Sequence, residues 1–204
     1  MAEVFVGEFM GVSFPRGEGF IVEHGEDARR CMADLGEAIM HKKPIDPADL
    51  PRRLEFDGET VPDPRPDIFG GYMPIVSERV ATVLRAFDIG AGAIFPMEAG
   101  ASMAGRGFPQ YYGLHVGTVK DSWDEAASTA VDVRVGRSWI YYMALVTGRG
   151  TVVMDASALT GPDIWREAHG ASRLLFFSAP LAKALLDVIV PEDGLRLYPC
   201  RVEA

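Results

Sequence analysis

Hydrophobic and polar positions follow the same order in two stretches of the chain, residues 66–98 and residues 162–203. Each stretch begins with Pro-Asp-Ile and an aromatic residue, in the forms PDIF and PDIW. Each continues with an amphipathic segment that follows a serine, then with glycine, and then with a short apolar segment. Because these patterns are typical of a capped helix and a strand, we predict two similar helix–turn–strand units. Two such units would most simply share one sheet.

A serine precedes the apolar face of each predicted helix. Ser77 precedes a first set of apolar positions at helical spacing, formed by Val80, Val83, Leu84 and Phe87. Ser178 precedes a second set, formed by Leu181, Ala184, Leu185, Val188 and Ile189. A serine oxygen accepts hydrogen bonds from the backbone N–H groups of the first helical turn, which otherwise lack partners. We therefore expect both serines to cap their helices.

Short segments rich in β-branched and aromatic residues predict strands elsewhere in the chain. These segments are Glu3–Phe14, Leu54–Phe56 and Tyr111–Val116, and a hairpin that pairs residues 139–146 with residues 151–154. A further helix is predicted over residues 27–40, and the proline-rich residues 42–66 are expected to form a covering loop. This pattern predicts an α+β fold with a mixed or mainly antiparallel sheet and a few packed helices.

The length of 204 residues is sufficient to bury a sizeable core without a disulfide. We predict a single α+β domain over residues 1–204, with an N-terminal subregion at residues 1–65 and a main region at residues 66–204. The two cysteines, Cys31 and Cys200, do not make a disulfide framework in a chain of this length. We expect both to be reduced.

The net charge of −9 argues against binding to nucleic acid, because contact with phosphate needs a surplus of Lys and Arg. An acidic surface instead suits a basic protein partner. The first residues lack the basic region and the apolar run of a secretory signal, and no segment has the length of a membrane span. We expect a cytoplasmic protein that does not bind membranes.

No catalytic or cofactor motif is found in the sequence. The segment around Ser102 resembles a nucleophile elbow, but its second glycine comes one position too late and no strand precedes it. The sequence has neither a dinucleotide-binding fingerprint nor a phosphate-binding loop. The histidines are too widely spaced for a zinc motif: His24, His41, His115 and His169. We therefore predict a protein that is not an enzyme and that has no cofactor and no metal.

Several segments, taken in order, resemble the immunity protein 11 family of bacterial polymorphic-toxin systems. They are PDIF before VSERVATVLRAF, then IFPME, YYGLHVGTVKDSWDEAAS, TVVMDASALTGPDIWRE, LLFFSAPLAKALLD and GLRLYP. The resemblance covers mainly residues 66–203. It implies an α+β protein that binds and neutralises a cognate toxin in the producing cell, and it supplies no catalytic residues.

The acidic turn after residue 120 is the predicted contact surface for such a toxin. An acidic protein inhibits a basic toxin when its carboxylates lie where an anionic substrate would sit. We expect Asp121, Asp124 and Glu125, with the neighbouring Trp123, to form part of this surface.

Two alternatives belong to other classes of protein. A small-molecule-binding protein or an enzyme would use a pocket near the glycine-rich residues 100–117, lined by Arg106, Tyr111, Tyr112 and His115. A homo-oligomer would use the edge of the predicted hairpin at residues 138–154 as its interface. A pocket with convergent titratable groups would favour the first alternative, and a flat acidic face would favour toxin binding.

Overall fold

The computed structural model describes residues 4–8, 20–23, 38, 43, 45–70, 73–124, 126–129, 133–135, 138–140, 151–168, 174–190 and 195–203. Within them, the helices are α2 (Glu78–Arg85) and α4 (Ala179–Val188), with short 3-10 turns η2 (Pro47–Asp49), η3 (Ala101–Met103) and η4 (Ala156–Leu159). The strands of the first half are β1 (Val4–Glu8), β2 (Phe20–Glu23), β3 (Arg53–Phe56), β4 (Ile68–Gly70), β5 (Pro74–Ser77), β6 (Ala93–Pro96), β7 (Glu98–Ala99) and β8 (Tyr111–His115). Those of the second half are β9 (Val119–Lys120), β10 (Val133–Val135), β11 (Ser138–Ile140), β12 (Val153–Asp155), β13 (Ile164–Glu167), β14 (Leu174–Ser178), β15 (Leu197–Pro199) and β16 (Arg201–Glu203).

The α+β prediction is confirmed, because two helices pack against sheets that are mainly antiparallel. The first predicted unit lies in a four-stranded sheet of order β4-β5-β8-β6, in which every neighbouring pair is antiparallel. The second lies in a five-stranded sheet of order β15-β1-β14-β13-β9, in which only β9 runs parallel to its neighbour. The two units therefore do not share one sheet, and that part of the prediction is wrong.

Each unit begins with two antiparallel strands that lead directly into a helix. Ile68 lies opposite Val76 in the first unit, and Ile164 lies opposite Phe177 in the second. The backbone N–H of Ser77 donates to the carbonyl of Asp67, and that of Ser178 donates to the carbonyl of Asp163, each over 2.9 Å. The relationship between the units stays a prediction, although these equivalent contacts are what it requires.

The two serines differ in how they serve their helices. Ser178 caps α4 as predicted, since its oxygen accepts a hydrogen bond from the backbone N–H of Leu181 at 3.4 Å. Ser77 occupies the same position before α2 but makes no such bond. Its hydroxyl instead donates to the buried carboxylate of Asp67 at 2.7 Å, which also pairs with Arg79. Ser178 likewise donates to a carboxylate, that of Asp163, so the two serines differ in whether the oxygen also accepts a hydrogen bond from the first turn of the helix.

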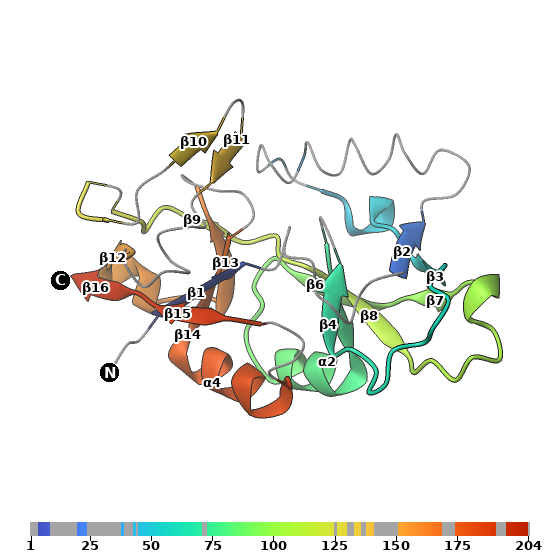
Figure 1. Cartoon of the computed structure of the whole chain (residues 1–204). Coiled ribbons are helices and arrows are strands. Elements are labelled where there is room, and N and C mark those ends of the chain that lie inside the picture. Colours follow the sequence, from blue (N-terminus) through green and yellow to red (C-terminus); the bar gives the residue numbers. More distant parts are fainter. Residues whose placement is uncertain are drawn as a thin grey trace.

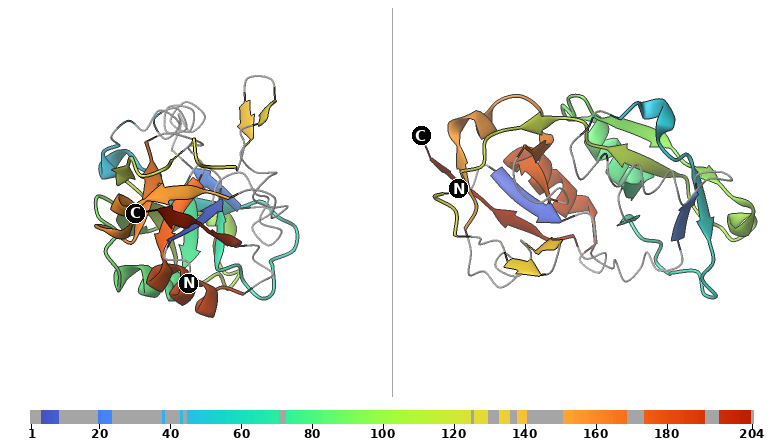
Figure 2. Two further views of the ribbon diagram at one scale, coloured as in Figure 1. Left: turned by 90° about the vertical axis from the view of Figure 1, so that its left-hand side faces the viewer. Right: turned by 90° about the horizontal axis from the view of Figure 1, so that it is seen from above.

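Helices α2 and α4 lie side by side on the same side of the molecule (Figure 1). Their buried residues belong to one hydrophobic core: Val80, Ala81 and Leu84 from α2, and Leu181, Ala182 and Leu185 from α4. The first unit and the sheet β2-β3-β7 occupy one half of the molecule, and the second unit with β12 and β16 occupies the other half (Figure 2). The helix pair joins the two halves.

The prediction that residues 151–154 pair with residues 139–146 in a hairpin is wrong for Met154. β11 pairs with β10, and β12 pairs in parallel with β16. The other edge of β12 is also occupied, because Met154 forms a bridge with Trp123 and the backbone N–H of Asp124 donates to the carbonyl of Val153. With both edges occupied, Met154 has no edge left for residues 139–146. Residues 141–146 themselves lie outside the described part.

Other predictions have mixed outcomes. Strands are found at Arg53–Phe56 and Tyr111–His115, as predicted, and the first predicted strand is found at Val4–Glu8, while its remaining residues lie outside the described ones. The helix predicted over residues 27–40 lies outside the described residues apart from residue 38. In the described part of the chain, no helix combines the length and the hydrophobicity needed to cross a bilayer.

Candidate functional site

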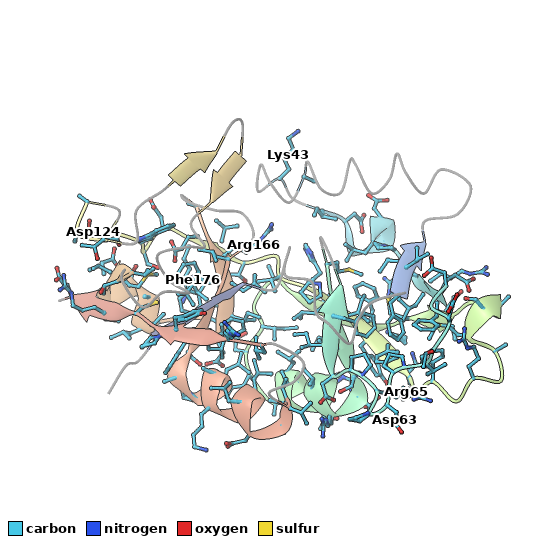
Figure 3. All side chains as sticks on the ribbon, viewed as in Figure 1. Lys43, Asp63, Arg65, Asp124, Arg166 and Phe176 are labelled. Carbon is cyan, nitrogen blue, oxygen red and sulfur yellow. The ribbon has the colours of Figure 1, made fainter. Side chains whose placement is uncertain are left out.

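The predicted acidic turn forms an exposed end of the molecule. Asp121 and Asp124 are exposed, and Figure 3 shows Asp124 at one extremity, beyond β12. The carboxylate of Asp124 accepts a hydrogen bond from the backbone N–H of Ala127 at 2.9 Å, which fixes the turn. Glu125, the third predicted acid, lies outside the described residues. Two of the predicted carboxylates therefore lie at the surface, one before and one after the buried pair Ser122 and Trp123.

Strand pairing brings further carboxylates to the same end. The backbone N–H of Asp155 donates to the carbonyl of Ser122 at 2.8 Å, and Asp155 lies opposite Glu203 in the pairing of β12 with β16. Both carboxylates are exposed, although Glu203 pairs with Arg201 at 2.7 Å. Asp121, Asp124, Asp155 and Glu203 together are called the acidic end below. Asp155 and Glu203 were not predicted, because strand pairing is what places them there.

A buried carboxylate anchors the acidic turn to the core. Glu167 in β13 is only 4% exposed and accepts hydrogen bonds from the Ser122 backbone N–H at 2.8 Å and from the Ser122 hydroxyl at 2.5 Å. It also accepts from the backbone N–H of Trp123 at 3.2 Å and from the indole N–H of Trp165 at 2.6 Å. Charge-assisted hydrogen bonds of this kind are about twice as strong as neutral ones. Glu167 therefore positions the segment that carries Asp121 and Asp124.

Trp123 lies in the core, so it adds little exposed area to the predicted contact surface. Its side chain is only 8% exposed and packs beside Phe176, with ring centroids 6.4 Å apart. Its indole N–H donates to the hydroxyl of Ser128 at 2.7 Å. Its backbone forms a bridge with Met154, and the neighbouring Ser122 is also buried, while Asp121 and Asp124 stay exposed. Trp123 thus supports the acidic end from beneath.

The residues of the alternative pocket do not converge. Five rings contact one another in an aromatic cluster: Phe20, Phe56, Phe69, Phe108 and Tyr111. Arg106 lies over the ring of Phe56 and donates to the backbone carbonyls of Gly58 and Glu59, and Tyr111 is buried within the cluster. Tyr112 follows Tyr111 on the strand and so points to the opposite face of the sheet, where it contacts Arg85. Burial, with a smaller contribution from Arg166, lowers the pKa of His115. The four side chains thus have three separate environments.

The aromatic cluster lies far from the acidic end. The guanidinium of Arg65 lies over Phe108 and donates to the carbonyl of Arg106, and Figure 3 shows Arg65 and Asp63 at the opposite extremity from Asp124. The two sites that the sequence suggests are therefore separate surfaces of the molecule.

Ser102 has a structural role. Its hydroxyl donates to Glu55 and accepts a hydrogen bond from the backbone N–H of Phe56 at 2.8 Å. The hydrogen bonds from Ser102, followed by those from Arg53, lower the pKa of Glu55 to about 2. A carboxylate of such low basicity is a poor general base, because an effective base has a pKa near the working pH. The pair therefore joins η3 to β3 and does not activate a nucleophile.

Lys120 also has a structural role. Its ammonium lies 3.7 Å from the centre of the Trp165 ring and donates to the carbonyls of Ala158, Thr160 and Pro162. Burial lowers its pKa, and nearby carboxylates such as Glu167 act in the opposite direction. Lys120 thus closes the loop around η4, next to the acidic end.

Metal-binding residues do not cluster in the described ranges, where no group of three or more His, Cys, Asp and Glu side chains has a geometry suited to a metal ion. Cys200 is a free, buried cysteine, and burial raises the pKa of its thiol. His24, His41 and His169 lie outside the described residues.

Comparison with known proteins gives one family. The model of the immunity protein family Imm11 matches residues 19–201. The chain belongs to the Imm11 immunity protein family. No curated protein and no solved structure matches it.

Membership in Imm11 confirms the resemblance found in the sequence and extends it toward the N-terminus, from residue 66 to residue 19. It indicates a role in immunity to a toxin, in a family that is generally not catalytic. The match includes the acidic turn and β12, and it leaves β1 outside.

Proposed function

We propose that this chain binds and neutralises a cognate bacterial toxin in the cytoplasm of the cell that produces it, without catalysis of its own. The observation that carries the proposal is the match of residues 19–201 to the Imm11 family. The net charge of −9 supports a basic toxin as the partner, since opposite charges accelerate the encounter of two proteins.

The acidic end is the surface proposed to meet the toxin. Its carboxylates come from a turn and two paired strands, and Glu167 fixes the turn through three hydrogen bonds from Ser122 and Trp123. A fixed backbone loses little conformational freedom on binding, so more of the interaction energy appears as affinity. Partial engagement of Asp124 and Asp155 with neighbouring N–H groups orients their carboxylates and leaves them exposed.

Capture of the toxin tests the proposal. The tagged full chain is used to isolate its partner from the native lysate, and the captured protein is identified by mass spectrometry. We expect one stoichiometric partner, encoded beside this gene, which is toxic when expressed alone and harmless when expressed with this chain. A purified mixture of the two that forms no complex would contradict the proposal.

The alternative of ligand binding near residues 100–117 gives a different result in the same experiment. Expression of this chain would then not protect cells from the neighbouring gene product. A small molecule would instead raise the melting temperature of the chain. Replacement of Arg106 by Ala would abolish that rise, whereas replacement of Asp124 by Ala would not.

A further inference from the structure

An exposed leucine lies on the loop that follows β12 at the acidic end. Leu159 is the last residue of η4 and is 48% exposed. η4 packs against β12 and β16, the paired strands that carry Asp155 and Glu203. Its neighbour Ala158 is buried and belongs to the same core cluster as Trp123. The loop is thus seated on the core beneath the acidic end, and Leu159 is left at the surface.

Hydrogen bonds fix the backbone of this loop on both sides of Leu159. Before it, the Oδ1 atom of Asp155 accepts from the backbone N–H and the hydroxyl of Ser157, at 2.7 and 2.5 Å. After it, the ammonium of Lys120 donates to the carbonyl of Thr160 at 2.7 Å, and the backbone N–H of Thr160 donates to the carbonyl of Ser157 at 3.2 Å. A side chain on a backbone that is already fixed costs little conformational freedom on binding. Leu159 is therefore a preorganised anchor.

The charged groups that this loop presents to solvent are carboxylates. Asp155 uses its Oδ1 atom in the bonds to Ser157, and within the described part of the chain its Oδ2 atom accepts no hydrogen bond. The backbone bond of Asp155 to Ser122 brings the exposed Asp121 to the same end. The ammonium of Lys120 is directed inward, at carbonyls of the loop and at the ring of a buried tryptophan. An exposed apolar side chain is thus bordered by negative charge.

Single exposed leucines are common on protein surfaces, so the surroundings of Leu159 decide what it fits. Leu186 in α4 has the same exposure, 48%, but it lies next to Asp187, which pairs with Lys183. The charges beside Leu186 therefore cancel, whereas those beside Leu159 have the sign of the net charge of −9. An apolar residue within a rim of carboxylates complements an apolar pocket that is bordered by Lys and Arg.

We propose that Leu159 is the apolar centre of the toxin-binding surface, with Asp155 and Asp121 in its rim, and that it enters an apolar pocket of the toxin bordered by basic residues. This inference rests on the proposed function and adds the chemistry of the contact to it. Burial of an apolar anchor slows dissociation, whereas exposed carboxylates accelerate association with a basic partner. Leu159 and the acidic residues therefore act on different steps of binding.

Binding kinetics of the full chain with the purified product of the neighbouring gene test the inference. Leu159→Ala is compared with Leu186→Ala, which removes the same atoms at the same exposure on another part of the surface. Surface plasmon resonance at about 0.05 M and about 0.5 M salt gives the association and dissociation rates. Thermal unfolding checks the fold, and both variants should melt within about 2 °C of wild type because both positions are exposed.

We expect Leu159→Ala to raise the dissociation rate at least about tenfold at both salt concentrations and to change the association rate by less than about twofold. Leu186→Ala should change both rates by less than about twofold. If both variants dissociate like wild type, the inference is overturned and the proposed function stands. A faster dissociation that comes with a lower melting temperature than that of Leu186→Ala would assign Leu159 a structural role and would also overturn the inference. A wild-type chain that neither binds the neighbouring gene product nor protects cells from it would overturn the inference and the proposed function together.

Discussion

Two carboxylates illustrate how single residues hold this molecule together. Glu167 is buried and accepts four hydrogen bonds, whereas Glu55 lies near the surface and accepts two from Ser102 and others from Arg53. Each carboxylate ties a loop to a strand, and so each fixes backbone geometry at a distance from its own element. Neither role depends on catalysis.

Replacement of Glu167 is expected to destabilise the fold. Glu167→Ala leaves several buried donors without an acceptor, each worth about 1–3 kcal/mol, so we expect a loss of more than about 3 kcal/mol. Glu167→Gln keeps one carbonyl acceptor and should cost less, about 2 kcal/mol. Urea denaturation followed by tryptophan fluorescence measures both changes.

The matched control for Glu167 is Glu98→Gln, at an exposed position, which should change the free energy of unfolding by less than about 0.5 kcal/mol. If Glu167→Ala is no more destabilising than this control, Glu167 does not anchor the acidic turn.

Ser102→Ala is expected to change how stability depends on pH. Because the hydrogen bonds of Ser102 depress the pKa of Glu55 to about 2, they stabilise the folded state above the ordinary carboxyl pKa of 4.5. This contribution is lost as the pH falls from 4.5 toward 2, where Glu55 becomes protonated. The stability difference between wild type and variant should therefore be largest at neutral pH and shrink below pH 4.5. Urea titrations at several pH values measure it, and a difference that grows as the pH falls would contradict the assignment.

At the scale of elements, Asp163 links the two helices. Its carboxylate accepts from the hydroxyl of Ser178 at 2.5 Å, at the start of α4, and from the backbone N–H of Asp88 at 3.0 Å, just after α2. Its own backbone N–H donates to the carbonyl of Asp88 at 2.7 Å. One residue thus fixes both the start of one helix and the chain that leaves the other.

Asp163→Ala is expected to destabilise the protein by about 2 kcal/mol, since it removes two hydrogen bonds to a carboxylate and frees the cap of α4. Thermal unfolding followed by circular dichroism measures the loss. The control is Asp187→Ala, which removes an exposed pair with Lys183 at 2.5 Å on the same helix and should cost at most about 0.5 kcal/mol. Equal effects of the two substitutions would contradict a linking role for Asp163.

At the scale of the whole molecule, charged side chains of opposite sign lie toward opposite ends. Asp124 of the acidic end lies at one extremity, and Arg65, which lies over the Phe108 ring of the aromatic cluster, lies toward the other (Figure 3). Association with a basic toxin should therefore depend on which end carries a substitution and not only on the net charge.

Asp124→Lys is expected to weaken toxin binding by at least about tenfold, mainly through slower association. Asp63→Lys makes the same change in net charge at the opposite extremity and should change the affinity by less than about twofold, because charges farther apart than about 8–10 Å are screened at physiological salt. Surface plasmon resonance at low and high salt measures both rates. Equal effects of the two variants would show that the acidic end is not the contact surface.

The sequence by itself determined the features that depend on neighbouring residues. Helical spacing located α4 and its cap at Ser178, the aromatic and apolar content of residues 111–116 located β8, and the polar turn placed Asp121 and Asp124 at the surface. The order of the segments along the chain also carries the resemblance to the Imm11 family, which the match to residues 19–201 confirms. These features depend on local periodicity and local hydrogen bonds, which can be read along the chain.

Only the tertiary structure decided which distant segments meet. It placed β1 between β14 and β15, occupied both edges of β12, turned Trp123 inward and brought Glu167 beneath the acidic turn. A strand's alternation shows that it has two faces but does not name its neighbours, since many partners offer the same backbone groups. The choice among those partners depends on how the whole core packs. It therefore cannot be predicted from the sequence of any single segment.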